Sequence, residues 1–269
     1  MPETSRLRRL FTGSRADRAI AFRALKRQIG GILLFRILGG IVNRANSPFL
    51  VTYRPDFDYD FRRFPQYRTL YETWGAGGQF ENRGDIGRLN LLCLNLMQVL
   101  REGVPGDAVE VGVYKGNTAK VLKELLRGTG RRLFLFDTFA GFDRSDIAGV
   151  DAHVTHTGFA DTSLDSVRDF VGSDDTIFVP GYFPDSARGA ALPQTVAVLH
   201  IDCDLYAPMK AALEMFYPRM QRGALIVLHD YASGHWPGAT QAIDQFFSDK
   251  AETVVIMPDK SGTAVVRKV

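Results

Sequence analysis

The sequence predicts a doubly wound α/β fold, in which helices cover both faces of a mostly parallel β-sheet. From about residue 85 onward, short apolar runs alternate with helical patterns, as in α/β proteins. The first runs are continuously apolar, which is typical of parallel strands buried on both faces. The last two runs are close enough in sequence to form an antiparallel hairpin.

Seven strands are expected in this part of the chain. They span residues 108–113, 132–137, 176–179, 195–201 and 224–228, followed by a hairpin of 253–257 and 263–267 around D-K-S-G. Helices are expected at 85–102, 117–126, 163–171, 183–189, 208–220 and 240–247. The first helix is amphipathic, since its apolar residues recur at helical spacing. Pro208 suits the first turn of its helix.

Length and cysteine content limit the class of protein. A chain of 269 residues is long enough to bury a large core without covalent cross-links. Its two cysteines, Cys93 and Cys203, are too few and too far apart for a disulfide framework or a zinc knuckle. A reducing, cytoplasmic location is therefore expected.

The basic charge is concentrated in the N-terminal arm. Residues 1–44 contain ten basic and two acidic residues, a balance of +8, so residues 45–269 carry −5 of the net +3. The apolar stretch 29–42 is shorter than the roughly 20 residues that span a bilayer, and Arg36 interrupts it. We expect a helix packed on the body or on a second copy, or alternatively one lying at a membrane surface. No nucleic-acid partner is expected.

These patterns divide the chain into three segments. The first is a basic and apolar helical arm at 1–47, the second an aromatic irregular arm or lid at 48–84, and the third an α/β domain at 85–269. The aromatic residues of the second segment either line a substrate entrance or cover the body. Within the third segment, residues 144–159 form a long polar loop of the kind that often covers a site. His153 and His156 in that loop are expected to be solvated.

The residues that follow the strands point to a nucleoside ligand. Residues 109–118 read V-E-V-G-V-Y-K-G-N-T, a strand followed by two glycines. This loop matches neither the dinucleotide fingerprint nor the P-loop. Asp137 ends the second strand, where a carboxylate can accept hydrogen bonds from both ribose hydroxyls. A nucleoside without pyrophosphate fits this pattern, and S-adenosylmethionine is such a ligand.

Five motifs together resemble the macrocin O-methyltransferase family. They are V-E-V-G-V-Y-K-G-N-T, L-F-D-T-F-A-G-F, H-I-D-C-D-L-Y, P-R-M-Q-R-G-A-L-I-V-L-H-D-Y and G-H-W-P-G-A-T-Q-A-I-D-Q-F-F, in the family's order over about residues 80–250. The resemblance implies a Rossmann-like class I methyltransferase fold. It also implies an S-adenosylmethionine-dependent enzyme that methylates a hydroxyl of a sugar or glycosylated natural product, with a divalent metal, Mg²⁺ or Mn²⁺. The acceptor is then a small molecule or saccharide.

Residue roles follow from this resemblance. Asp202 and Asp230 match metal ligands, and Asp204 matches the general base. The family has a second acid where this chain has His229, and an imidazole ligand would favour Mn²⁺, Fe²⁺ or Zn²⁺ over Mg²⁺. Alternatively, His229 serves as a base or only forms a hydrogen bond with Asp230. His235 and Trp236 are candidate substrate contacts. The expected cofactor-binding residues are Glu110, Gly112, Tyr114, Thr118, Asp137, Thr138, Phe139, Gly181 and Tyr182.

Two alternatives remain open from the sequence. The substitution at His229 also fits a non-catalytic or metal-independent nucleoside-binding protein. Asp137 alone would suit a nicotinamide-dependent oxidoreductase, although the missing glycine of the fingerprint argues against that class. If the backbone after the fourth strand stays extended, the side chains of Asp202 and Asp204 should point to opposite sides.

Overall fold

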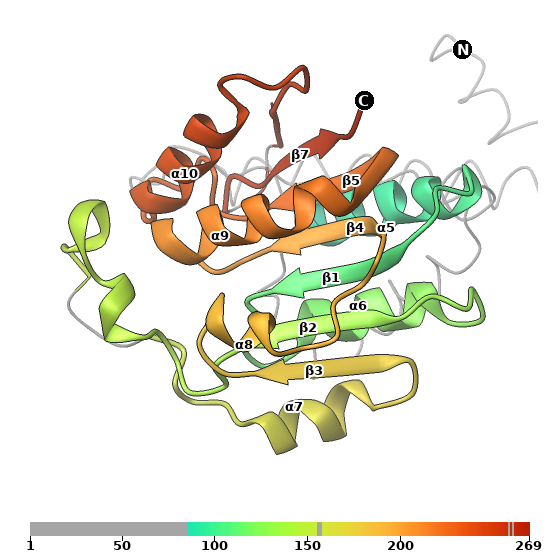
Figure 1. The fold of residues 1–269 in the computed structure, drawn as a ribbon, viewed down its shortest axis with the longest axis horizontal. Coiled ribbons are helices and arrows are strands. Elements are labelled where there is room, and N and C mark those ends of the chain that lie inside the picture. Colours follow the sequence, from blue (N-terminus) through green and yellow to red (C-terminus); the bar gives the residue numbers. More distant parts are fainter. Residues whose placement is uncertain (1–85, 155–157, 258, 260) are drawn as a thin grey trace, which may run out of the picture. The chain divides into compact units, whose positions relative to one another are not determined.

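The computed structural model describes residues 86–154, 158–257, 259 and 261–269. These residues form a seven-stranded sheet in the order β3-β2-β1-β4-β5-β7-β6 (Figure 1). The first five strands pair in parallel, and β7 runs antiparallel to both of its neighbours. The predicted mostly parallel sheet with a C-terminal hairpin is thereby confirmed. The strands are β1 (Asp107–Val111), β2 (Leu133–Asp137), β3 (Thr176–Pro180), β4 (Val196–Ile201), β5 (Met220–Leu228), β6 (Val255–Ile256) and β7 (Ala264–Arg267).

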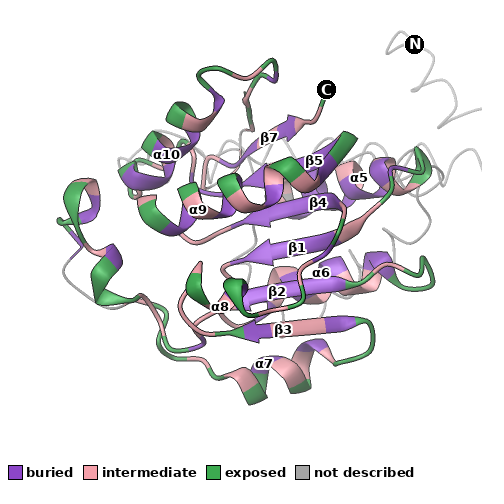
Figure 2. Ribbon diagram, in the orientation of Figure 1, coloured by how far each residue is buried: buried purple, intermediate pink, exposed green. Residues whose placement is uncertain are grey.

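The central strands are buried along nearly their whole length. Every residue of β4 is buried, as are the last four residues of β1 and the last five of β5 (Figure 2). Burial on both faces explains why these strands are continuously apolar in sequence rather than alternating. His200 in β4 and Glu110 in β1 are the exceptions, and their side chains face each other across adjacent strands.

Helices cover both faces of the sheet. In Figure 1, α8 and α9 lie in front of the sheet, whereas α5 and α6 lie behind it. Helix α7 packs on α6, and α10 packs on α9. The helices are α5 (Ile86–Arg101), α6 (Asn117–Leu126), α7 (Leu164–Val171), α8 (Asp185–Arg188), α9 (Tyr206–Phe216) and α10 (Pro237–Phe247). This is the two-layered covering expected of a doubly wound fold.

The predicted helix 208–220 was wrong at both ends. Helix α9 begins at Tyr206 and ends at Phe216, and Met220 already belongs to β5. Pro218 explains the early end, because a residue without an N–H cannot continue the helix, and a 3₁₀ turn at Tyr217–Arg219 follows instead. The polar loop after β2 also contains two short 3₁₀ turns, at Arg144–Asp146 and Gly149–Asp151.

The strand order places a crevice between β1 and β4. The chain runs from β1 outward through β2 and β3, and then returns to β4 on the other side of β1. Ligands of such sheets bind outside the carboxyl ends of the strands, at this reversal. Gly112 follows β1 with a φ of 87°. A Cβ atom there would lie 2.0 Å from the carbonyl oxygen of Asp202, so only glycine lets the ends of β1 and β4 approach so closely.

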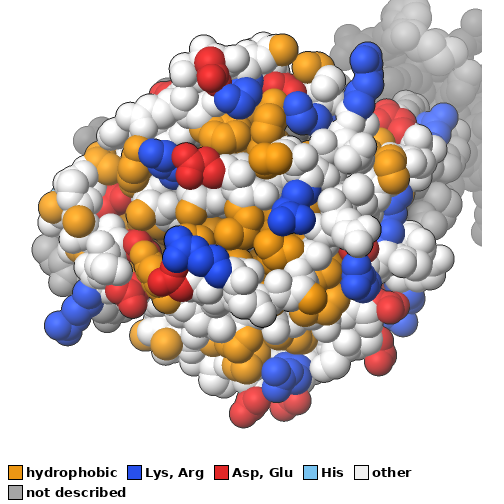
Figure 3. Space-filling view, viewed as in Figure 1, with side chains coloured by type: hydrophobic (Ala, Val, Ile, Leu, Met, Phe, Trp, Pro, Cys, Tyr) orange, Lys and Arg blue, Asp and Glu red, His pale blue; other side chains and the backbone are white. Residues whose placement is uncertain are grey.

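Several expectations lie outside the described residues. The N-terminal arm, the aromatic segment 48–84 and His156 are among them. Among the residues that are described, no helix is long and apolar enough to cross a membrane. Both cysteines are described and both are free. The face drawn in Figure 3 carries Lys and Arg side chains interspersed with Asp and Glu.

Candidate active site

A cavity of about 600 Å³ opens at the carboxyl ends of the strands. All but one of the fifteen residues that the sequence singled out line it. The exception is Phe139, whose side chain is 6% exposed and belongs to the core instead. The cavity also contains residues that sequence reasoning did not select, including Arg88, Phe142, Asp146 and Phe159.

Asp137 organises the turn that follows β1. Its Oδ2 atom accepts hydrogen bonds from the backbone N–H groups of Val113, at 2.6 Å, and Tyr114, at 2.9 Å. Its Oδ1 atom accepts from the backbone N–H of Phe139, at 2.6 Å. Tyr114 and Phe139 both have a positive φ, of 50° and 52°. These bonds stabilise a backbone conformation that non-glycine residues rarely adopt, so Asp137 has a structural role in the turn whatever ligand it also contacts.

Glu110 forms a buried polar site at the floor of the cavity. Its side chain is 1% exposed, and its Oε1 atom lies 3.0 Å from Nδ1 of His200. Its Oε2 atom has no hydrogen-bond partner among the described residues. Burial raises the pKa of Glu110 well above its usual value, and the pKa of His200 is lowered to about 3, first by burial and then by Arg88.

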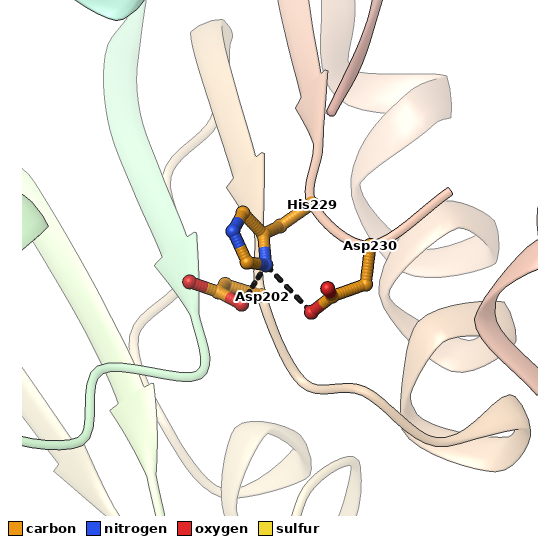
Figure 4. Close-up of side chains that lie close together, drawn as sticks. All are labelled: Asp202, His229 and Asp230. Carbon is orange, nitrogen blue, oxygen red and sulfur yellow. Dashed lines mark hydrogen bonds and ion pairs between the residues drawn. The ribbon is translucent and has the colours of Figure 1, made fainter. Parts of the chain in front are cut away.

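Three ligating side chains meet at the ends of β4 and β5 (Figure 4). Asp202, His229 and Asp230 each offer one ligand atom, and these atoms all lie within 4.8 Å of one another. The Nδ1 atom of His229 lies between two carboxylates, 2.7 Å from Asp202 Oδ1 and 2.6 Å from Asp230 Oδ2. From the other side, Nη2 of Arg88 donates to Asp202 Oδ2 at 2.5 Å. Helix α5 thus contributes a cation to an acidic cluster formed by the strand ends.

The charges of this cluster shift the pKa values of its members. Burial alone would lower the pKa of His229, but Asp202 and the hydrogen bonds to both carboxylates outweigh it and raise the pKa to about 9. The pKa of Asp202 is lowered, because His229 and Arg88 together outweigh its burial. In the absence of a bound metal, a protonated imidazole therefore neutralises part of the acidic charge.

Asp204 does not follow the extended geometry assumed from the sequence. Its φ is 63°, in the left-handed region, so the argument that Asp202 and Asp204 point to opposite sides does not apply. The side chain of Asp204 instead shares a hydrogen bond with Asp230 and lines the same cavity. Burial, followed by the charges of Asp202 and Asp230, raises its pKa well above the usual value. Strained backbone of this kind is often found at functional sites.

An aromatic group borders the cavity beyond the acidic cluster. Trp236 contacts Phe142 edge to face, with ring centroids 5.6 Å apart, and Phe142 contacts Phe159 in the same way at 5.2 Å. Phe159 also contacts Tyr114, at 5.1 Å. These residues come from three separate connections: Tyr114 follows β1, Phe142 and Phe159 lie between β2 and α7, and Trp236 precedes α10. The sequence signalled Trp236 and Tyr114 but gave no reason to join them to Phe142 and Phe159.

The sheet order, the reversed last strand and the cavity at the strand ends together define a Rossmann-like class I methyltransferase fold. Residues 84–265 match the family model described as macrocin-O-methyltransferase. The chain therefore belongs to the macrocin O-methyltransferase family, whose members are S-adenosylmethionine-dependent O-methyltransferases.

Two relatives and one solved structure show the extent of the similarity. The chain is 34% identical over 163 residues to a 4'-O-methyltransferase of 8-demethyl-8-(2,3-dimethoxy-alpha-L-rhamnosyl)-tetracenomycin C from Streptomyces olivaceus, covering 55% of this chain and 61% of that protein. It is 30% identical over 174 residues to the mycinamicin III 3''-O-methyltransferase of Micromonospora griseorubida, covering 59% and 67%. The structure of the O-methyltransferase NovP superposes with a TM-score of 0.61 at 25% identity, covering 68% of this chain and 80% of that one.

Proposed function

We propose that this protein is an S-adenosylmethionine-dependent O-methyltransferase that acts on a hydroxyl of a sugar or of a glycosylated small molecule. One observation carries the proposal. A single cavity joins the turn organised by Asp137 to the acidic cluster around Asp202. The first half suits a nucleoside cofactor, and the second suits activation of a hydroxyl group, so that methyl donor and acceptor would meet between β1 and β4.

The cofactor half offers groups for each part of S-adenosylmethionine. The carboxylate oxygens of Asp137 have lone pairs left to accept from the ribose hydroxyls. Glu110 lines the cavity and its Oε2 atom has no hydrogen-bond partner among the described residues, so we expect this atom to accept from the ammonium group of the methionine moiety. Gly112 permits the ligand to approach the backbone, and Gly181 and Tyr182 border the cavity after β3. Thr118 and Thr138 complete the polar lining of this half.

The donor set also fits a divalent metal ion. Asp202, His229 and Asp230 present two carboxylates and an imidazole nitrogen within one coordination sphere of each other. A metal there would lower the pKa of a coordinated hydroxyl and orient it. The oxygen-rich set accommodates Mg²⁺, whereas the imidazole shifts the preference toward Mn²⁺. Binding through His229 Nδ1 would require that atom to lose its proton.

Asp204 is the residue we assign to proton removal from the acceptor. A sugar hydroxyl is a weak nucleophile, so a base must take its proton as the oxygen attacks the methyl group. Asp204 shares a proton with Asp230 in the metal-free protein, so it would have to lose that proton before it could accept one from the acceptor hydroxyl. Once ionised, its carboxylate would be a stronger base than an ordinary aspartate, because burial and the charges of Asp202 and Asp230 raise its pKa. Its hydrogen bond to Asp230 fixes the carboxyl group beside the acidic cluster. Correct placement of the two substrates supplies the rest of the acceleration, because the sulfonium is already an activated methyl donor.

The aromatic residues support an acceptor with an apolar part. Trp236 and Phe142 can pack on the face of a sugar or on a flat hydrophobic group, and His235 lies in the same lining. The names of the two relatives above describe methylation of a glycosylated tetracenomycin and of mycinamicin III. A glycoside is therefore the acceptor class to test first.

The N-terminal residues have a separate proposed role. Residues 1–44 combine a charge of +8 with an apolar stretch, and the family match begins only at residue 84. We expect them to mediate self-association or peripheral membrane attachment of a cytoplasmic enzyme, and to be dispensable for cofactor binding. Removal of residues 1–44 should then change oligomeric state or lipid binding while leaving S-adenosylmethionine affinity unchanged.

Calorimetry and turnover together test the proposed function. S-adenosylmethionine should bind and NAD should not, which separates this function from the nicotinamide-dependent alternative. With a rhamnosylated acceptor, mass spectrometry should detect a gain of one methyl group. Turnover should increase with Mn²⁺ or Mg²⁺ and decrease with chelator. Cofactor binding without methylation of any glycoside in a broad panel would favour the non-catalytic alternative, and full turnover in chelator would eliminate the metal.

A further inference from the structure

Side-chain contacts hold the loop after β2 in place on two sides of the cavity. On the β3 side, the hydroxyl of Tyr182 donates to Asp146 Oδ1 at 2.8 Å. On the opposite side, the loop reaches the beginnings of α9 and α10 through Asp151. Phe142 and Asp146 of the same loop line the cavity, so the position of the loop determines part of the cavity wall.

Asp151 is fully buried and serves as a cap for α9. Its Oδ2 atom accepts the backbone N–H of Tyr206, the first residue of that helix, at 2.7 Å. Leu205, the residue at the N-cap position, provides no side-chain hydrogen bond of its own. No cation pairs with Asp151 within the described part of the chain, and its Oδ1 atom has no hydrogen-bond partner there. The N–H of Tyr206 and the positive end of the α9 dipole are therefore the favourable groups that face this side chain. A residue 55 positions away thus completes the start of α9.

The same carboxylate also lies against the first turn of α10. A Cβ atom on Gly238 would lie 2.3 Å from both Asp151 oxygens, closer than any real contact. Alanine is otherwise the better helix former, so Asp151 explains why glycine is present at this helical position. The carboxylate therefore fits between the N-terminal turns of two helices.

We propose that Asp151 is a positioning residue that holds residues 142–154 against the starts of α9 and α10 and thereby shapes the acceptor side of the cavity. This inference rests on the proposed methyltransferase function. Helix α9 begins two residues after Asp204, and α10 begins directly after Trp236. Fixing the loop to both helix starts therefore sets the distance between Phe142 on the loop and the residues assigned to the acceptor.

Hydrogen exchange measures this attachment without any substrate. In Asp151→Ala, amides across residues 142–154 and at the start of α9 should exchange about tenfold faster, the effect of losing one hydrogen bond of ordinary strength. Asp151→Asn keeps one acceptor oxygen, so its exchange should be intermediate. Asp169→Ala, an exposed aspartate in α7, is the matched control and should leave these amides unchanged.

A double-mutant cycle tests the contact between Asp151 and Gly238. Gly238→Ala alone should release the loop as Asp151→Ala does, because the new methyl group takes the space of the carboxylate. The double variant lacks the Asp151 carboxylate with which the new methyl group would clash. Adding Gly238→Ala to Asp151→Ala should therefore cause no further acceleration of hydrogen exchange. Gly189→Ala is the control, since Gly189 has an ordinary φ of −94° and nothing lies within 4 Å of the added atom.

Kinetics then separate a positioning role from a merely structural one. Both Asp151→Ala and Gly238→Ala should raise the KM of the glycoside acceptor about tenfold, while calorimetric S-adenosylmethionine affinity changes less than about twofold. Unchanged exchange at residues 142–154 in both variants would overturn the inference, as would equal losses of acceptor and cofactor binding. Failure of the wild-type protein to methylate any glycoside would instead count against the proposed function, since the exchange measurement does not depend on turnover.

Discussion

The Nδ1 atom of His229 lies 2.7 Å from the Oδ1 atom of Asp202. Such a distance between a ring nitrogen and a carboxylate oxygen requires a hydrogen between them, because two lone pairs would repel. Asp230 approaches the same nitrogen at 2.6 Å from the other side. The nitrogen that would ligate a metal is thus the atom that holds a proton in the metal-free protein, and metal and proton must compete for it.

This competition predicts a pH-dependent metal affinity. The pKa of His229 is raised to about 9, so Nδ1 keeps its proton throughout the neutral range and loses it only as the pH approaches that value. Mn²⁺ affinity measured by calorimetry should therefore increase with pH, by up to about tenfold per unit between roughly pH 6.5 and 8.5. His229→Asp replaces the protonated imidazole with a carboxylate. The variant's metal affinity should therefore depend less on pH, and its metal preference should shift toward Mg²⁺. A wild-type Mn²⁺ affinity that is constant over this range would contradict the assignment of His229 as a ligand.

Asp137 provides a test of the cofactor half. Asp137→Ala removes the acceptor for the expected ribose hydroxyls and also for the backbone N–H groups of Val113 and Tyr114. S-adenosylmethionine binding should weaken by about 1.5–3 kcal/mol, the range for hydrogen bonds to a charged group. Asp107→Ala is the control, because Asp107 begins β1 at the far end of the strand and pairs with Arg132. A folded Asp137→Ala protein with unchanged affinity would remove Asp137 from the cofactor site.

The sheet and the place of the site could be predicted because both depend on local sequence patterns. Continuous apolar runs indicate strands buried on both faces, and parallel strands bring their carboxyl ends to one edge. Asp137 ends such a strand, and Asp202 and Asp230 follow two others, so a shared cavity could be expected before their distances were known.

Contacts between distant segments could not be predicted in the same way. Arg88 reaches Asp202 across 114 positions, and its place on an amphipathic helix resembles that of any polar residue beside an apolar face. The sequence argument on Asp204 applied only if the backbone there stayed extended, whereas this backbone turns into the left-handed region before α9 begins. Asp151 lies in a polar loop whose sequence gives no sign that its carboxylate is fully buried. These features depend on how helices pack on the sheet, which periodicity does not encode.

Asp204→Asn tests the proposed base. The amide preserves the size of the side chain and a hydrogen bond to Asp230, but it cannot take a proton from the acceptor. Cofactor and metal affinity should remain near wild type while kcat decreases by about 10² to 10⁴, the usual contribution of general-base catalysis. Asp202→Ala should behave differently, lowering metal affinity and turnover together. Wild-type turnover in Asp204→Asn would assign proton removal to another group.

Glu252 provides a test of stability that is independent of the cavity, since it does not line it. Its carboxylate accepts from the Tyr217 hydroxyl at 2.7 Å, from Lys268 Nζ at 3.0 Å and from the backbone N–H of Val269 at 3.2 Å. The side chain is only 1% exposed. Burial alone would raise the pKa of Glu252, but the hydrogen bonds from Tyr217 and Lys268 outweigh it and lower the pKa to about 2.

Glu252→Gln should therefore reduce the free energy of unfolding at pH 7 by about 1–3 kcal/mol, the cost of leaving buried partners of a charged group incompletely paired. A glutamate in the unfolded chain has a pKa of about 4.3. Because the folded value is lower, the stabilisation is fully present above that pH and is lost as the pH falls toward 2. Urea unfolding at pH 7, 4 and 3 should show the difference between wild type and variant shrinking over this interval. Glu214→Gln is the matched control, because its side chain is 58% exposed and lies 3.9 Å from Lys210, so its stability should stay within about 0.5 kcal/mol of wild type. Equal stability of wild type and Glu252→Gln at pH 7 would show that the ion pair with Lys268 does not stabilise the end of the sheet.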